Sequence, residues 1–88
     1  MAVPEICRFL GIIITMYFND HNPPHFHVRY EDHRAIIGID PLEVREGYLP
    51  PRVLGLAMEW AEMHQKELME NWTTISQAGT FKRIAPLV

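Results

Sequence analysis

Hydrophobic and polar residues alternate through much of the first half of the chain, and this pattern predicts β-strands. Residues 8–18 are rich in isoleucine and aromatic residues, which favour strands. In residues 25–32 the alternation is strict, and 34–40 and 42–49 are shorter runs of the same kind, separated by a break at Asp40-Pro41. We therefore expect an antiparallel β-meander of about four strands.

The hydrophobic spacing changes to three and four residues after Pro50-Pro51, which indicates a helix over about 52–77. Gly79 is a suitable stop for it. The apolar stripe of this helix consists of Val53, Ala57, Trp60, His64, Leu68, Trp72 and Ile75. The pattern predicts an α+β fold in which residues 1–88 form a single small domain, with one long C-terminal helix packed on one face of the sheet.

The expected packing decides which side chains of the second predicted strand are available for function. Successive side chains of a strand point to opposite faces. If Phe26 and Val28 face the helix, then His25, His27 and Arg29 lie on the opposite face. Core packing does not require histidine there, so we expect a functional reason for the cluster.

Composition and charge narrow the range of functions only slightly. A chain of 88 residues with 48% hydrophobic and 22% charged residues is typical of a folded domain, and its apolar content is compatible with a homodimer. The net charge of −3 argues against broad, non-specific binding to nucleic acids. The single cysteine, Cys7, fits a reducing compartment and a buried position. The apolar run 9–18 is too short for a membrane span and lacks the features of a signal peptide, so we expect a cytoplasmic protein that does not enter a membrane.

The stretch NDHNPPHFHV, residues 19–28, contains three of the five histidines and allows a metal site. His25 and His27 are two residues apart on one strand face, a spacing that suits zinc or another divalent ion. His21 or Asp20 in the preceding turn would supply a third ligand.

The same residues also allow metal-free acid–base chemistry. Imidazoles titrate near neutral pH, and an arginine beside them can hold a phosphate, so His25, His27 and Arg29 are candidate catalytic residues for RNA cleavage without a cofactor. The candidates for substrate contact, including an aromatic ring for base stacking, are His21, Asp20, Tyr17, Lys82 and Arg83.

A third interpretation makes the open sheet face a protein interface, with the histidines there for packing or pH sensing. Histidine and arginine beside isoleucines such as Ile13 and Ile36 are compatible with it. His64, on the apolar stripe of the helix, is expected to be a buried histidine bonded to a nearby acceptor. These three interpretations remain open at the level of the residues.

Particular segments of the chain carry a family resemblance. They are Gly11, the run 19–28, Leu42-Glu43-Val44 ahead of Gly47, Leu49-Pro50-Pro51-Arg52, Trp60 and Asn71-Trp72. On these residues the chain resembles a family of small bacterial proteins known as domain of unknown function 4160. The resemblance implies a domain often encoded beside another small protein, in an arrangement similar to a toxin–antitoxin pair. Our working hypothesis is a toxin-like component that acts on RNA, with a small partner protein encoded nearby; the alternative is an antitoxin-like or regulatory protein-binding module.

Overall fold

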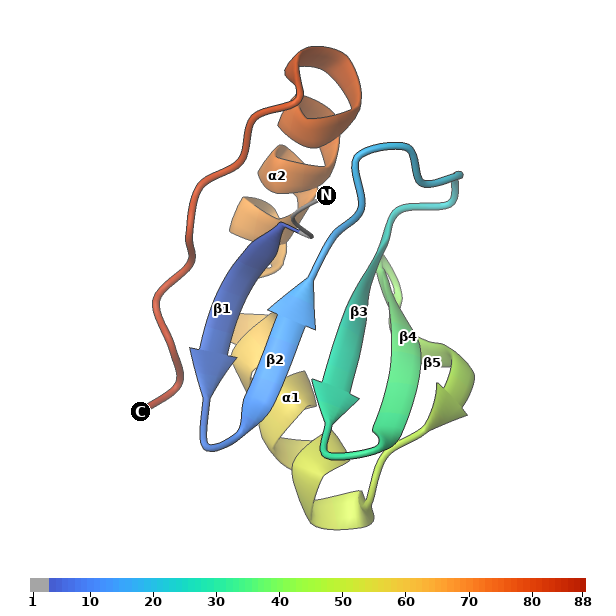
Figure 1. Cartoon of the computed structure of the whole chain (residues 1–88), viewed down its shortest axis with the longest axis vertical. Coiled ribbons are helices and arrows are strands. Elements are labelled where there is room, and N and C mark those ends of the chain that lie inside the picture. Colours follow the sequence, from blue (N-terminus) through green and yellow to red (C-terminus); the bar gives the residue numbers. More distant parts are fainter. Residues whose placement is uncertain (1–3) are drawn as a thin grey trace.

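A computed structural model describes residues 4–88 of the chain. Five strands form one antiparallel sheet in the order of the sequence, β1-β2-β3-β4-β5 (Figure 1). Their bounds are Glu5–Phe9 (β1), Ile12–Thr15 (β2), His25–Tyr30 (β3), His33–Ile39 (β4) and Leu42–Tyr48 (β5). The α+β class and the meander are confirmed, but the expected number of about four strands is wrong by one.

The additional strand comes from a turn inside the apolar run that the pattern predicts as a single strand. Leu10 and Gly11 have φ angles of +50° and +79°, and positive φ at both central positions is the geometry of a tight two-residue hairpin. The run 8–18 therefore contains the end of β1, the turn and all of β2. Strand propensity is high on both sides of Gly11, so the composition of the run hides the reversal.

The expected long helix is two helices, α1 (Pro51–Met63) and α2 (Gln65–Ala78), and this is a second correction. His64 lies between them in a non-helical conformation, with φ −124° and ψ 21°. Its Nδ1 atom is 2.6 Å from Oε1 of Glu67 in the first turn of α2, so the expected bond to an acceptor is confirmed, but the residue is half-buried rather than buried. A break of one residue leaves the hydrophobic stripe in phase, so the periodicity does not reveal it.

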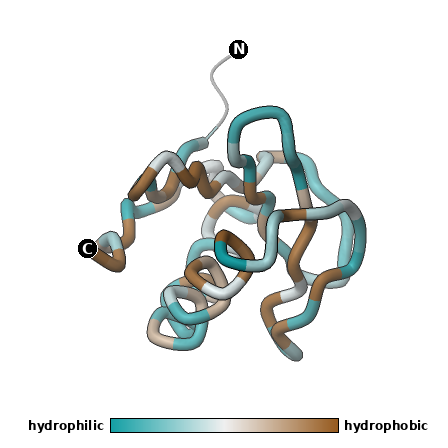
Figure 2. The backbone as a smooth tube through the Cα atoms, turned by 90° about the horizontal axis from the view of Figure 1, so that it is seen from below, coloured by the Kyte–Doolittle hydropathy of each residue, from teal (hydrophilic) through white to brown (hydrophobic). Residues whose placement is uncertain are grey.

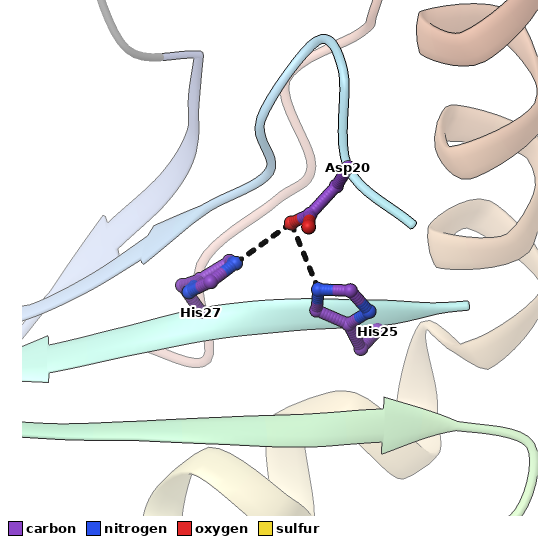
Figure 3. Close-up of side chains that lie close together, drawn as sticks. All are labelled: Asp20, His25 and His27. Atoms are coloured by element: carbon purple, nitrogen blue, oxygen red, sulfur yellow. Dashed lines mark hydrogen bonds and ion pairs between the residues drawn. The ribbon is translucent and has the colours of Figure 1, made fainter. Parts of the chain in front are cut away.

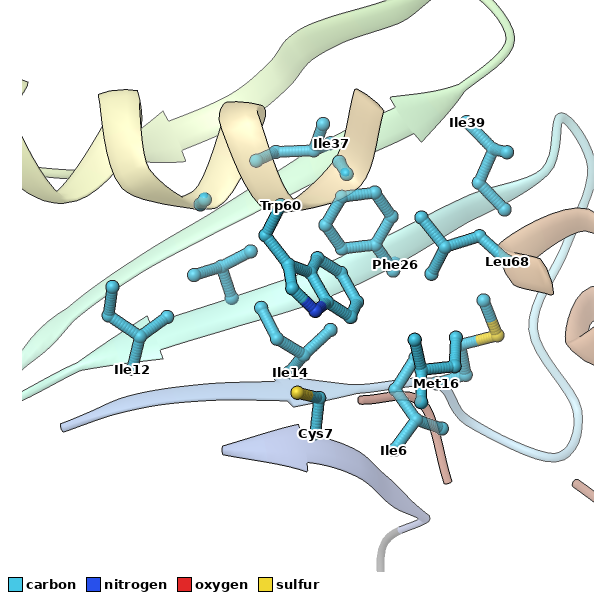
Figure 4. Close-up of a cluster of buried hydrophobic side chains, with 14 of the residues drawn as sticks. Ile6, Cys7, Ile12, Ile14, Met16, Phe26, Ile37, Ile39, Trp60 and Leu68 are labelled. Carbon is cyan, nitrogen blue, oxygen red and sulfur yellow. The ribbon is translucent and has the colours of Figure 1, made fainter. Parts of the chain in front are cut away.

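The hydrophobic core lies between the helices and one face of the sheet, and Trp60 is at its centre (Figure 4). The Trp60 side chain is fully buried, and its ring packs near those of Phe26 and Phe9 at centroid distances of 6.1 Å. Cys7 is buried in the same core, as expected. Phe26 and Val28 also point into it, so the predicted facing of β3 toward the helices is confirmed.

The C-terminal segment 79–88 runs beside β1 (Figure 1), and its last residues are hydrophobic (Figure 2). The backbone N–H of Ile84 donates to the carbonyl oxygen of Ile6 over 2.9 Å. Indole Nε1 of Trp60 donates to the carbonyl oxygen of Ala85 over 2.8 Å. The segment therefore covers the β1 edge of the sheet and supplies the acceptor for the central tryptophan.

The opposite face of the sheet is not covered by α1, which lies behind the strands in Figure 1, whereas α2 extends past the ends of the strands. Within residues 4–88, neither helix combines the length and the apolar character that crossing a membrane requires.

Candidate functional site

The uncovered side of the sheet carries the histidines of β3 near its N-terminal end. His25 and His27 are two residues apart on this strand, so their side chains project to the same face. Their ring centroids are 5.2 Å apart in an edge-on arrangement. Strand alternation therefore brings the two imidazoles together, as the sequence predicts.

The loop between β2 and β3 folds back over the start of β3 and brings Asp20 to the histidines (Figure 3). Oδ2 of Asp20 is 2.8 Å from Nε2 of His25 and 2.9 Å from Nε2 of His27. One ligand atom from each of the three residues lies within 4.8 Å of the others. We call Asp20, His25 and His27 the triad.

The protonation of His25 is constrained by its second ring nitrogen. Nδ1 is 2.8 Å from the carbonyl oxygen of Pro23, and a carbonyl can only accept a hydrogen bond, so Nδ1 carries a proton. In the neutral ring, Nε2 then presents a lone pair to the carboxylate oxygen of Asp20. That contact is favourable when a proton or a metal ion lies between the two atoms.

The environment of Asp20 favours its charged form. Burial alone would raise the pKa of this carboxyl. The hydrogen bond with His27, the charge of His25 and the backbone N–H of His21 outweigh burial and hold the pKa below its usual range. The loop therefore presents a carboxylate to two imidazoles.

Aromatic neighbours fix the orientation of both rings. The rings of Tyr17 and His27 pack edge to face with centroids 4.3 Å apart, and the ring of His25 lies 5.1 Å from that of Trp72 in α2. The His25 residue is only 8% exposed, whereas the side chains of His27 and Asp20 are 23% and 21% exposed. The contact with Trp72 departs from the expectation that His25 faces away from the helix. The triad is therefore closed on the His25 side and open on the side of His27.

A hollow of about 690 Å³ on the uncovered sheet face begins at His27. We call it the sheet hollow. Its floor includes the isoleucines Ile13 and Ile36, and Arg29 and Arg34 lie side by side across β3 and β4. The remaining lining residues are Glu5, Arg8, Thr15, Tyr17, Val28, Ala35, Glu46 and Gly47. His27 thus belongs both to the triad and to the wall of the hollow.

The structure brings some of the predicted site residues together and leaves others apart. Tyr17 and Arg29 lie in the sheet hollow beside His27. His21 is exposed, and it contacts the triad through its backbone N–H, which is 3.1 Å from Oδ1 of Asp20. Lys82 and Arg83 are on the C-terminal segment, where Arg83 pairs with Glu5 at 3.4 Å, and neither lines the hollow.

Two residues of this region are missing from the sequence-based prediction. Arg34 pairs with Arg29 because the turn between β3 and β4 consists of Glu31 and Asp32 alone. The sequence suggests a turn at this place but does not give its length, and the register depends on that length. Trp72 reaches His25 through the packing of α2, a long-range contact that leaves no local signal.

Comparisons with known proteins add one match. A family model described as domain of unknown function (DUF4160) matches residues 11–73, which include the triad and most of the sheet hollow. No curated protein and no solved structure matches the chain.

Proposed function

The chain belongs to the DUF4160 family, a domain of unknown function, and we propose from the geometry of its site that it binds a divalent transition-metal ion through Asp20, His25 and His27. The observation that carries this proposal is the pair of contacts made by Oδ2 of Asp20 with Nε2 of both histidines. Two imidazole nitrogens and one carboxylate are a donor set typical of zinc and of non-haem iron.

The hydrogen bond between His25 and Pro23 supports a ligand role for His25. Histidines that bind metals usually donate their other ring N–H to a carbonyl or a carboxylate, which fixes the tautomer and the ring orientation. Here the Pro23 carbonyl oxygen accepts from Nδ1 and leaves Nε2 free to coordinate. An ion about 2.0–2.2 Å from each donor needs only a small separation of these atoms.

Three protein ligands leave at least one coordination position unfilled, which is the arrangement of reactive rather than purely structural metal sites. The open side of the triad is the side of His27, where the side chain is 23% exposed and the sheet hollow begins. A bound ion would therefore present its free position toward the hollow, where a second ligand can reach it.

Metal titration of tag-free protein tests this proposal. We expect one zinc ion per chain by elemental analysis after dialysis, and an affinity that falls by at least about tenfold in Asp20→Asn, His25→Gln and His27→Gln. Loss of a donor removes both a coordinate bond and, for Asp20, the negative charge that offsets the ion.

His21→Gln is the matched control, because His21 is in the same loop but its exposed ring makes no hydrogen bond or ion pair with the triad. It should bind zinc like the wild type. Circular dichroism of every variant separates loss of ligand from loss of fold. Absence of any stoichiometric transition-metal ion in folded wild-type protein, or an equal loss of affinity in His21→Gln, would contradict the proposal.

A second candidate function is the toxin-like, metal-free action on RNA. The supporting observation is that His27 and Arg29 line the same hollow, with Tyr17 against the ring of His27. In this candidate His25 and His27 transfer protons and Arg29 binds a phosphate. A small partner protein encoded nearby would act as the antitoxin.

Growth of a bacterial culture after induction distinguishes this candidate. We expect wild-type protein to arrest growth and the double variant His27→Ala/Arg29→Ala to relieve the arrest while accumulating to the same level. His33→Ala, at the far end of the β3–β4 hairpin, should arrest growth like the wild type. A culture that grows normally with wild-type protein would remove the toxin candidate and leave the metal proposal untouched.

A further inference from the structure

Arg29 and Arg34 form a cross-strand pair of like charges on the uncovered sheet face. They are direct partners in the antiparallel register of β3 and β4, and directly opposite side chains on one face have Cβ atoms about 4.5–5.5 Å apart. Like charges at that separation destabilise a sheet. Within residues 4–88 neither arginine has a carboxylate within salt-bridge distance, whereas Arg8, Arg45 and Arg83 each do.

The carboxylates of the sheet hollow do not neutralise this pair. Glu5 is engaged by Arg8 at 2.6 Å and by Arg83 at 3.4 Å on the β1 side. Glu46, on β5, is paired in the register with Ile36 rather than with either arginine. The centre of the hollow therefore combines two unpaired guanidinium groups with an apolar floor, which fits a ligand that carries a concentrated negative charge.

The arginine pair is close to the triad on the same face. Arg29 follows His27 by two residues, so their Cα atoms are roughly 7 Å apart along the strand. Ile13, paired with Arg29, and Ile36, paired with His27, fill the floor around them. A small organic ligand that contacts the arginines can therefore extend over the isoleucines as far as His27.

We propose that Arg29 and Arg34 bind the phosphate group of a phosphate ester, with the organic part of the ester lying on the isoleucine floor toward the triad. Two adjacent guanidinium groups offer paired N–H donors that match phosphate oxygens and compensate their charge. The phosphate in turn relieves the repulsion between the arginines. The direction of the ester toward a metal ion rests on the proposed function; the binding of phosphate by the arginines does not.

Calorimetric titration with three probes tests the site: inorganic phosphate, 5′-AMP and a six-nucleotide single-stranded RNA, each with apo and zinc-loaded protein. We expect wild-type protein to bind 5′-AMP, and Arg29→Gln and Arg34→Gln to weaken the binding by at least about tenfold. Arg52→Gln is the matched control, because it removes the same charge from an exposed position on α1, outside the hollow. It should bind like the wild type.

Thermal unfolding is a second test. If the arginines only stabilised the fold, replacing Arg34 would lower the melting temperature, whereas a ligand-binding role predicts no decrease in the absence of ligand. Arg34→Gln should melt at the same temperature as wild-type protein or higher without ligand, because it removes a like-charge contact. Added 5′-AMP should raise the melting temperature of the wild type and not that of the variant. A marked destabilisation by Arg34→Gln in the absence of ligand would count against the site.

The outcomes separate the two proposals. Binding of 5′-AMP that depends on both arginines but persists in Asp20→Asn, together with no zinc uptake, would keep the phosphate site and remove the metal function. Equal binding by wild type, Arg29→Gln and Arg34→Gln, or no binding of any probe by the wild type, would overturn the phosphate site. Much tighter binding of the RNA than of 5′-AMP would identify a polynucleotide as the source of the phosphate, and comparable binding a small ester.

Discussion

At the scale of single residues, the sequence predicts the site best where the alternation of one strand determines which side chains share a face. His25 and His27 are brought together by alternation along β3, which the pattern of the sequence contains. Asp20 and His21 are equal candidates in the sequence because the path of a loop is not periodic. The structure places the Asp20 carboxylate between the histidines and leaves the His21 ring exposed. This difference follows from the path of the loop, which the sequence pattern does not give.

Cys7 provides a prediction at this scale that concerns pH. Burial raises the pKa of its thiol in the folded protein. A raised pKa contributes stability that is complete below the unfolded value of about 8.5 and is lost as the pH rises above it. We therefore expect the free energy of unfolding of the wild type to fall between pH 8 and pH 10 relative to that of Cys7→Ala, as measured by urea denaturation.

The same burial should protect the thiol from modification. Cys7 is 1% exposed, so an aromatic disulfide reagent should react with native protein only as fast as the chain opens, and at once in denaturant. A parallel pH profile for wild type and Cys7→Ala, or rapid labelling of the native protein, would show that the side chain is accessible.

At the scale of elements, the sequence predicts types better than boundaries. The strand character of residues 8–18 and the helical stripe of 52–77 are both real, yet each run contains a reversal or a break. Secondary-structure propensity is summed over many neighbouring residues, so it does not detect a two-residue turn at Leu10-Gly11 or a single non-helical residue at His64. Gly11 is the one local signal for the turn, and the break at His64 has none.

The C-terminal segment yields a prediction about the link between elements. The Asn71 side chain in α2 is buried; its Nδ2 donates to the carbonyl oxygen of Lys82 over 2.8 Å and its Oδ1 accepts from the Lys82 N–H over 2.9 Å. Asn71→Ala removes both bonds and should lower the free energy of unfolding by about 1–3 kcal/mol, measured by urea denaturation. Glu70→Ala, an exposed neighbour on the same helix, should change it by less than about 0.5 kcal/mol. Equal stability of the two variants would mean that the segment is held by other contacts.

At the scale of the whole molecule, the arrangement of layers was predictable and the position of the site only in part. An apolar helix stripe requires an apolar sheet face, which leaves the other face of a short meander uncovered. The sequence therefore predicts which face carries Arg29 and His27. It does not predict the sheet hollow, because the hollow depends on the register of all five strands and on the twist of the sheet.

The meander order of the sheet has a consequence for the time course of folding. Every strand pairs with its neighbour in sequence, so the sheet can assemble through short hairpins that close quickly. The contact of Ile84 with Ile6 joins segments from opposite ends of the described chain, and such a contact has the largest loop-closure cost. We infer that the C-terminal segment docks after the rate-limiting step. Asn71→Ala should then leave the refolding rate nearly unchanged and accelerate unfolding. The segment would in that case slow the unfolding of a sheet that assembles without it.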